Sequence, residues 1–495
     1  MKNIKTLLIS ALTIGSLGMC SCDNSVKIGP QPTPDPVPEE GTDVKMITTT
    51  SNRAKDLTVS GIAFSKKDNM SPSCITILPE EQYQTMDGFG VAVTGSTCYN
   101  LLKMSPEDRK SFLEVTFDPV NGYGFSYVRI SIGCSDFSLS EYTCCDKEGI
   151  GNFSLTKEET DYVIPVLKEI LAINPSLKIM GTPWTPPKWM KVKDLQSLEP
   201  FDSWTSGSLN PRYYADYGEY FVKWIKAFEQ NGIKIYSVTP QNEPLNRGNS
   251  ASCYMPWEEE RDFIKNGLGP ALKNAGLDVK VYAFDHNYNY DNIESQKGYP
   301  VNIYADGEAA DYLDGAAYHN YGGDKEELIS VHNAAPGMDL VFTETSIGTW
   351  NNGRDLSARL LDDMEQVALG TVNRWCKGVI VWNLMLDEER GPGGCQTCFG
   401  AVDINHDYTT ITRNSHYYII AHMSSVVKPG AVRVGTKGFT TNGLTYTAFR
   451  NTDGSFALVA SNNNSMALSF TVDDGVHHFS TTVPAKSAVS YAWNN

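Results

Sequence analysis

Residues 235–244 read Ile235-Tyr-Ser-Val-Thr-Pro-Gln-Asn-Glu-Pro244, and this stretch decides the predicted fold. Its apolar, β-branched start predicts a buried strand, and the polar residues that follow predict a loop. Glu243 would then lie at the carboxyl end of a strand, where parallel α/β barrels carry out chemistry. The stretch Met338-Asp-Leu-Val-Phe-Thr-Glu-Thr345 has the same form and ends at Glu344. Taken alone, either glutamate could equally be a capping group or a surface charge.

Eight segments have the length and apolar character of buried strands, and helix-like segments separate several of them. The predicted strands are 88–94, 127–133, 178–184, 234–238, 280–285, 315–319, 339–343 and 378–384, and the clearest helices are 160–172, 213–229, 257–275 and 356–375. Strands that alternate with helices form a parallel sheet, and eight of them favour a (β/α)8 TIM barrel. We therefore predict an α/β fold whose barrel occupies residues 86–423.

Both ends of the chain have a different pattern. Residues 44–85 and 424–495 contain short alternating segments separated by Asn, Asp and Gly turns. This pattern is typical of antiparallel strands. We predict a side β-sandwich that is built from the two chain ends together.

The N-terminal residues 1–21 predict an export signal, because a basic start precedes an apolar run too short to span a membrane. The run ends in Cys20-Ser-Cys22, which resembles a bacterial lipoprotein signal with Cys22 as the lipidated residue and Cys20 as the alternative. An ordinary cleaved signal peptide is the other reading. Residues 22–43 are a Pro-rich tether. We expect a monomeric exported lipoprotein on the outer membrane, at the cell surface or the periplasmic face, attached only through its lipid.

Charge and cysteine content exclude several classes of partner. The 495 residues carry 41 Lys plus Arg against 58 Asp plus Glu, a net charge of −17, so nucleic acid is not an expected partner. Nine of the 11 cysteines remain after Cys20 and Cys22, an odd number. Cys395 and Cys398 predict a loop disulfide or two thiols, and not zinc, since no second such pair accompanies them. We expect no metal and no cofactor.

Polar and aromatic residues gather at the predicted strand ends and are candidates for substrate binding. They are Arg129, Asp136, Trp184, Asn242, Asp285, His286, His319, Tyr321, Trp382 and Asn383. Two carboxylates on separate strands can flank one glycosidic bond: Glu344 would attack the anomeric carbon, and Glu243, kept protonated by its environment, would serve as acid and then base. Asn242 would hold the sugar 2-hydroxyl, and Trp184 and Trp382 would form walls against the sugar. Trp189, Trp257 and Trp350 are expected to pack in the core.

The sequence resembles glycoside hydrolase family 30, from about residue 45 to its end. The resemblance rests on Asp87-Gly-Phe-Gly90, Val128-Arg-Ile-Ser-Ile-Gly-Cys-Ser-Asp-Phe-Ser138, Thr182-Pro-Trp-Thr-Pro-Pro-Lys-Trp-Met190, Thr239-Pro-Gln-Asn-Glu-Pro244, Phe342-Thr-Glu344 and Trp382-Asn-Leu-Met-Leu-Asp387. It implies a TIM barrel fused to a side β-sandwich, a retaining mechanism, Glu243 as acid/base and Glu344 as nucleophile. The family includes glucosylceramidases and endo-β-1,6-glucanases.

One departure from the family pattern separates these two activities. Glucosylceramidase-like members have Thr-Asp where this chain has Thr94-Gly95, and we expect the missing carboxylate to leave room for a continuing glucan chain. Asp285-His-Asn-Tyr288 and Gly393-Gly-Cys-Gln-Thr-Cys398 also resemble the β-1,6-glucanase branch. A β-glucan is thus the expected substrate. A glucosylceramidase or broad β-glucosidase stays open, as does a non-catalytic glycan-binding lipoprotein; the intact glutamate pair argues against the last.

Overall fold

The structure is a computed structural model that describes residues 26–27, 42–66, 71–289 and 293–494. Cys20, Cys22 and most of the Pro-rich tether lie outside the described residues, so export and lipidation stay predictions. Among the helices within these ranges, none is both long enough and apolar enough to cross a bilayer.

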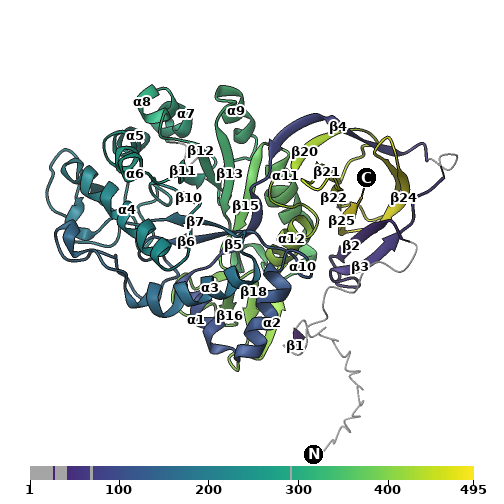
Figure 1. Ribbon diagram of the computed structural model, residues 1–495, viewed down its shortest axis with the longest axis horizontal. Helices are drawn as coiled ribbons and strands as arrows, with labels where there is room; N and C mark the ends of the chain where they lie inside the picture. Colours follow the sequence, from purple (N-terminus) through teal and green to yellow (C-terminus); the bar gives the residue numbers. More distant parts are fainter. Residues whose placement is uncertain (1–25, 28–41, 67–70, 290–292, 495) are drawn as a thin grey trace, which may run out of the picture.

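A closed barrel of eight parallel strands forms the centre of the molecule (Figure 1). Its strands are β5 (Gly88–Ala92), β6 (Tyr127–Ser131), β7 (Lys178–Thr182), β10 (Ser237–Val238), β11 (Lys280–Asn287), β12 (Gly315–His319), β13 (Asp339–Glu344) and β15 (Cys376–Val381). They follow one another around the barrel in sequence order, and β15 closes it by pairing with β5. The predicted α/β barrel is confirmed.

Large side chains fill the inside of the barrel, as is usual for this fold. One buried cluster consists of Tyr127, Met180, Tyr282, Ala317, Val341 and Ile380, each from a different strand. At the amino ends of the strands, Lys178 pairs with Asp87 at 2.7 Å and Lys280 with Asp339 at 2.9 Å. These contacts close that end, so the carboxyl ends are left for chemistry.

Helices surround the barrel. They are α1 (Gly95–Lys103), α2 (Pro106–Phe117), α3 (Ile164–Ile173), α4 (Tyr214–Gln230), α5 (Trp257–Phe263), α6 (Gly269–Ala275), α7 (Tyr299–Tyr304), α8 (Gly307–Ala310), α9 (Glu327–Ala334), α10 (Leu356–Asp363), α11 (Leu369–Val372) and α12 (Ser415–Ser424). Three of the four predicted helices contain a π-helical turn, at Glu159–Val163, Ile264–Leu268 and Met364–Ala368. The first two lie just before Pro165 and Pro270, whose missing N–H removes one bond of the regular helix.

Both chain ends contribute to a nine-stranded sheet beside the barrel, as predicted. Its order is β24-β23-β4-β20-β21-β22-β25-β2-β3. The strands are β2 (Val44–Thr50), β3 (Thr58–Ile62), β4 (Cys74–Thr85), β20 (Val432–Gly438), β21 (Leu444–Arg450), β22 (Phe456–Asn462), β23 (Leu468–Asp473), β24 (His478–Val483) and β25 (Ser487–Trp493). β2 pairs with β25, and β4 lies between β20 and β23.

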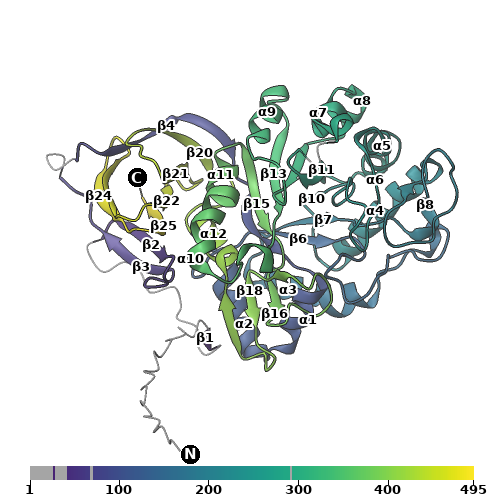
Figure 2. The same cartoon turned by 180° about the vertical axis from the view of Figure 1, so that it is seen from behind.

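Helices α10, α11 and α12 lie between the barrel and this sheet in both views (Figure 1, Figure 2). His422 of α12 hydrogen-bonds Ser490 at 2.8 Å and Thr49 at 2.9 Å, so one buried imidazole joins the barrel to strands from both chain ends. Short strands complete the fold: β1 (Val26–Lys27), β8 (Lys191–Val192), β9 (Ser208–Leu209), β14 (Ile347–Gly348), β16 (Met385–Asp387), β17 (Cys398–Phe399), β18 (Val402–Ile404) and β19 (Thr410–Arg413).

Candidate active site

The two predicted catalytic glutamates both lie at the carboxyl end of the barrel. Glu243 follows β10, and Glu344 is the last residue of β13. Their exposed fractions are 6% and 5%, so each carboxylate is almost enclosed but keeps a small accessible surface. The other candidates lie around them, Arg129 in the middle of β6, Asp285 and His286 within β11, and the rest at strand ends or in the loops that follow. They are Arg129, Asp136, Trp184, Asn242, Asp285, His286, His319, Tyr321, Trp382 and Asn383.

Arg129 is the cationic centre of this site and has no exposed surface. Its guanidinium donates to Glu344 Oε2 at 2.5 Å, to Asn242 Oδ1 at 2.7 Å and to Asp285 Oδ2 at 2.8 Å. A planar guanidinium can bind several acceptors at once because its N–H donors have a fixed geometry. Arg129 therefore holds the Glu344 carboxylate in place and fixes the oxygen of Asn242, which leaves the NH2 group of Asn242 as the donor for a substrate.

Asp285 is the anionic partner of Arg129. It also accepts from Thr343 at 2.6 Å and from Thr239 at 2.8 Å, and its Oδ1 lies 3.0 Å from His319 Nε2. Although burial acts to raise the pKa of Asp285, the positive charges of Arg129 and His319 hold it below its usual range. Asp285 is therefore a permanent negative charge beneath the two glutamates.

A β-bulge brings two neighbouring side chains of β11 into the site. The register shifts between Phe284 and His286, and Phe284 and Asp285 have positive φ angles of 74° and 56°. In a regular strand, consecutive side chains point to opposite faces. The bulge lets Asp285 contact Arg129 while His286 offers a ligand atom close to Glu243.

Glu243 is surrounded by hydrogen-bond donors. Its Oε1 lies 3.3 Å from His319 Nδ1, and its Oε2 accepts from the amides of Asn246 at 2.7 Å and Asn249 at 2.9 Å. Although burial acts to raise the pKa of Glu243, the bond from His319 and the nearby imidazole charges, His286 included, lower it to about 2. The prediction that the environment keeps Glu243 protonated is therefore wrong for the free enzyme, because these groups favour the carboxylate.

The proton that Glu243 lacks is held by His319. Burial acts to lower the pKa of this imidazole, but the negative charges of Glu344 and Asp285 and the hydrogen bond to Glu243 raise it to about 9. His319 is therefore an imidazolium between two carboxylates. In contrast, burial and the charge of Glu243 raise the pKa of Glu344, although His319 and Arg129 oppose this. Tyr321 also donates to Glu344 Oε1 at 2.9 Å.

Most of the predicted substrate-binding residues are too deeply buried to contact a substrate in this conformation. Arg129, Asp285, His286, His319 and Asn383 have no exposed surface. Arg129 and His319 contact the two glutamates, and Asp285 holds both of these cations. His286 accepts from the backbone N–H of Asn287 at 2.8 Å, and Asn383 accepts from the Thr94 hydroxyl at 2.7 Å. Asp136 is half-buried and Tyr321 is 41% exposed, so these two remain candidates for direct contact. Asn242 is 3% exposed, close to the 5% of Glu344, and stays a candidate because Arg129 holds only its oxygen.

The tryptophans also differ from expectation. Trp184 and Trp382 are 1% and 2% exposed, and their rings stack on each other with centroids 5.3 Å apart. The Arg129 guanidinium carbon lies 4.9 Å from the Trp184 ring centroid and 5.5 Å from that of Trp382. Their faces are covered, so the prediction that they form walls against the sugar is wrong for this conformation. Trp189 and Trp257 pack on the core as predicted, whereas Trp350 is 52% exposed.

Several polar residues of the site could not be singled out from the sequence. Thr182, Thr239 and Thr343 lie at or beside the ends of three strands and hydrogen-bond Arg129 or Asp285. Their common position near the strand ends was the one feature of the sequence that could have marked them as site residues. Asn246 and Asn249, which hold Glu243, follow it in a short polar loop. Loop residues of this kind cannot be oriented without the structure.

Glu243, His286 and His319 offer three ligand atoms within 4.8 Å of one another, a spacing that could hold a metal ion. Both ring nitrogens of His319 already face carboxylates, at 3.3 and 3.0 Å. A metal would have to displace the proton of His319, whose pKa is raised to about 9. Metal binding at this cluster would therefore release a proton and depend on pH.

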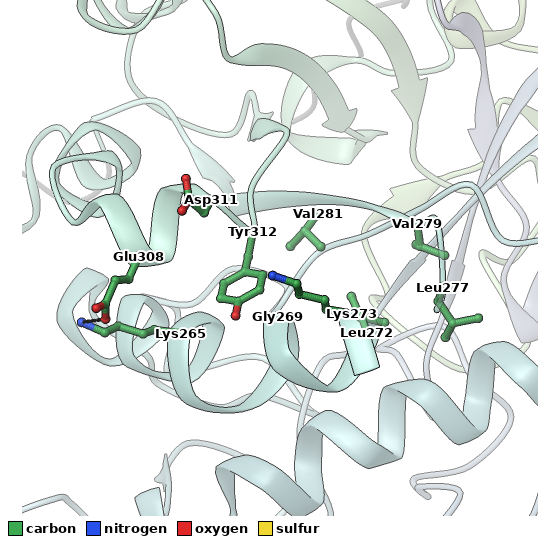
Figure 3. A pocket seen from close by; sticks show the side chains of 10 residues that line it. All are labelled: Lys265, Gly269, Leu272, Lys273, Leu277, Val279, Val281, Glu308, Asp311 and Tyr312. Carbon is green, nitrogen blue, oxygen red and sulfur yellow. Dashed lines mark ion pairs between the residues drawn. The ribbon is translucent and has the colours of Figure 1, made fainter. Parts of the chain in front are cut away.

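A cavity of about 460 Å³ on the outer side of the barrel has a different character (Figure 3). Its lining residues come from α6, α8 and their neighbours and include none of those that surround Glu243 and Glu344. Lys265 pairs there with Glu308 at 2.7 Å, and Lys273 lies over the ring of Tyr312. Its two carboxylates, Glu308 and Asp311, lie on the outer side of the barrel and Glu308 is paired with Lys265, whereas Glu243 and Glu344 are buried together at the carboxyl end. The barrel end therefore remains the candidate active site.

The space beside Gly95 is occupied, contrary to the prediction that it leaves room for a glucan chain. A Cβ at Gly95 would lie 1.9 Å from Glu158 Oε1. Glu158 is buried, which raises its pKa to about 7, and its other oxygen accepts from the backbone N–H of Leu139 at 2.9 Å. A carboxylate from another segment thus fills the place next to Gly95 and supports the loop that carries Asp136.

Replacing Gly95 with aspartate is expected to lower the free energy of unfolding by about 1–3 kcal/mol, because the new side chain overlaps Glu158. Urea unfolding measures the effect. Gly151→Asp is the matched control, since a Cβ at Gly151 meets nothing within 4 Å. Adding Glu158→Ala to Gly95→Asp should recover part of the loss. Equal stability of Gly95→Asp and Gly151→Asp would contradict the close contact.

Two family models match the chain. Residues 86–427 match the glycosyl hydrolase family 30 TIM-barrel domain, and residues 430–491 match the family's β-sandwich domain. The chain belongs to glycosyl hydrolase family 30. This confirms the family and the enzyme class predicted from the motifs: family 30 members are glycoside hydrolases.

Relatives within family 30 carry two different names. A solved structure of an endo-β1,6-glucanase is 66% identical, has a TM-score of 0.90, and is matched over 92% of this chain and 99% of its own. The endo-1,6-β-D-glucanase of Neurospora crassa is 31% identical over 414 residues, 80% of this chain and 82% of that protein. The lysosomal acid glucosylceramidase of Mus musculus is 29% identical over 493 residues, 93% and 91% of the two chains.

Proposed function

We propose that this family 30 enzyme cleaves internal β-1,6-glucosidic bonds of a β-glucan with retention of configuration. The observation that carries the chemistry is the pair Glu243 and Glu344 at two strand ends, each with a small accessible surface and each contacted by a cation. The substrate rests on the 66% identity, over 92% of the chain, to an endo-β1,6-glucanase.

In the first step, Glu344 attacks the anomeric carbon and forms a covalent glycosyl-enzyme. Arg129 and Tyr321 hold its two oxygens, so only a small movement separates the resting carboxylate from attack. The proton for the leaving oxygen comes from Glu243. Because His319 Nδ1 lies 3.3 Å from Glu243 Oε1, a bound substrate that excludes water favours transfer of the His319 proton to Glu243.

In the second step, Glu243 takes a proton from a water molecule, which attacks the anomeric carbon and releases Glu344. The Asn246 and Asn249 amides keep the Glu243 carboxylate oriented throughout. Asn242 can donate its NH2 group to the sugar 2-hydroxyl, since Arg129 fixes its oxygen. This contact strengthens in an oxocarbenium-like transition state.

A glucosylceramidase or broad β-glucosidase activity is the second candidate, favoured by the 29% identity to a lysosomal glucosylceramidase over 93% of the chain. The catalytic pair would be the same. The two activities differ in what lies beyond the scissile bond, a further glucan unit or a lipid.

Product analysis tests the proposal, with a linear β-1,6-glucan, a β-1,3-glucan, glucosylceramide and an aryl β-glucoside incubated in parallel. We expect a ladder of β-1,6-linked oligosaccharides from the first glucan and no products from the second. Release of glucose only from the aryl glucoside or glucosylceramide would replace the proposal with the second candidate. Failure to turn over any of the four would favour a glycan-binding protein.

A further inference from the structure

Residues 395–398 form a tight turn that leads into β17, of which Cys398 is the first residue. The backbone N–H of Cys398 points to the Cys395 carbonyl at 3.4 Å, and the Cys398 thiol lies close enough to Cys395 to lower the pKa of Cys395. Cys395 is half-buried and accessible, whereas Cys398 is only 8% exposed. The turn thus offers one reachable sulfur and one sheltered sulfur in contact with it.

This turn touches both sides of the candidate active site. On one side, β17 pairs with β14, which begins three residues after Glu344, and Thr349 donates its N–H to Thr397 at 2.9 Å. On the other side, a Cβ at Gly394 would lie 2.8 Å from the carbonyl oxygen of Asp136. The cysteine turn therefore links the segment after the predicted nucleophile to the loop that carries Asp136.

The two sulfurs differ in reactivity. Hydrogen bonding from Cys398 lowers the pKa of Cys395 to about 5, with help from Thr397, whose hydroxyl lies 3.0 Å from the sulfur. The same contact, together with burial, raises the pKa of Cys398. In the described part of the chain, the other cysteines have raised pKa values because they are desolvated: Cys74, Cys98, Cys134, Cys144, Cys145, Cys253 and Cys376. A thiolate next to a sheltered thiol is the arrangement that undergoes disulfide exchange.

We propose that Cys395 and Cys398 form a reversible disulfide that fixes this turn and tightens substrate binding. The oxidant is a small disulfide such as oxidised glutathione. The Cys395 thiolate attacks one of its sulfurs and releases one glutathione thiolate; Cys398 then loses its proton and attacks the Cys395 sulfur, which releases the second. Two protein thiols become one disulfide, and one oxidised glutathione becomes two reduced molecules.

The expected effect on binding follows from the position of the turn. A disulfide across two intervening residues removes backbone freedom from the contacts to Asp136 and to the segment after Glu344. A binding site that is ordered in advance loses less entropy when the substrate binds. This part of the inference rests on the proposed glucanase function, whereas formation of the disulfide does not.

The test equilibrates the full chain in buffers with increasing ratios of oxidised to reduced glutathione. Alkylation of free thiols and the mass of the peptide that contains residues 395–398 report the disulfide, which removes two hydrogen atoms. We expect this peptide to be oxidised first, and the KM for β-1,6-glucan, or for an aryl β-glucoside if the glucan is not cleaved, to fall about threefold with kcat nearly unchanged.

Two variants separate this effect from general oxidation. Cys395→Ser should keep the KM of the reduced enzyme at every glutathione ratio. Cys74→Ser is the matched control, because Cys74 is the other half-buried cysteine described and lies in the side sheet, so this variant should respond as the parent does. The proposal is overturned if residues 395–398 stay alkylatable in oxidised glutathione alone. A disulfide that forms without any change in KM would overturn its link to substrate binding.

Discussion

Glu344→Gln is expected to lower kcat by about four orders of magnitude on both β-1,6-glucan and an aryl β-glucoside. An amide has the shape of the carboxylate and keeps contact with Arg129 and Tyr321, but it cannot attack the anomeric carbon. Initial rates on the two substrates measure the loss. Glu260→Gln is the control. Glu260 is another buried glutamate, but burial raises its pKa to about 8, so it is already neutral at pH 7, and the activity of this variant should be unchanged.

Glu243→Gln should behave differently on the same two substrates. It too should lose turnover of the glucan, whose leaving oxygen needs a proton. An aryl glucoside with a good leaving group needs no such help, so the first step should survive and appear as a burst of phenol before slow hydrolysis. If Glu344→Gln gives the burst and Glu243→Gln does not, the proposed roles of the two glutamates must be exchanged.

Arg129→Met is expected to lower the free energy of unfolding by about 3–5 kcal/mol, because it leaves the buried Glu344 without its paired cation and leaves Asp285 with His319 alone. Asp285 and Glu344 pair with this guanidinium at 2.8 and 2.5 Å and are almost completely enclosed. Urea unfolding at neutral pH measures the change, and activity should fall with it because Glu344 loses its anchor.

Arg109→Met provides the comparison for this prediction. Arg109 also makes a bidentate ion pair, with Glu169, but this pair lies near the surface. Such pairs contribute about 1 kcal/mol or less to the free energy of unfolding. A loss in Arg129→Met no larger than in Arg109→Met would show that the buried ion cluster contributes little to stability.

The barrel could be predicted from the sequence because its strands are short apolar runs that end in polar residues. Of the eight predicted strands, 234–238 agrees least with the structure, since only Ser237–Val238 of it pair as a strand. The positions of Glu243 and Glu344 followed from the same pattern. Strand ends in a parallel barrel converge whatever the details of packing, so the positions of the two glutamates in the sequence were enough to predict where the active site lies.

Details that depend on three-dimensional contacts could not be predicted in this way. The protonation of Glu243 depends on His319 and on two loop asparagines, and a pKa is set by such neighbours and not by position. The bulge at Phe284 breaks the alternation on which strand prediction relies. The approach of Glu158 to Gly95 joins segments that are far apart in the chain, and no local pattern records it.

The way the side sheet is assembled has a consequence for synthesis of the protein. Strands β2 and β4 leave the ribosome early, but their partners β25 and β20 emerge only after the whole barrel has been made. Pairing across such sequence separations is slow, and unpaired strand edges attract other chains in the meantime. A chain that stops just before Ser487 would complete the barrel but leave β2 without its inner neighbour, so we expect such a chain to aggregate more readily than the full one.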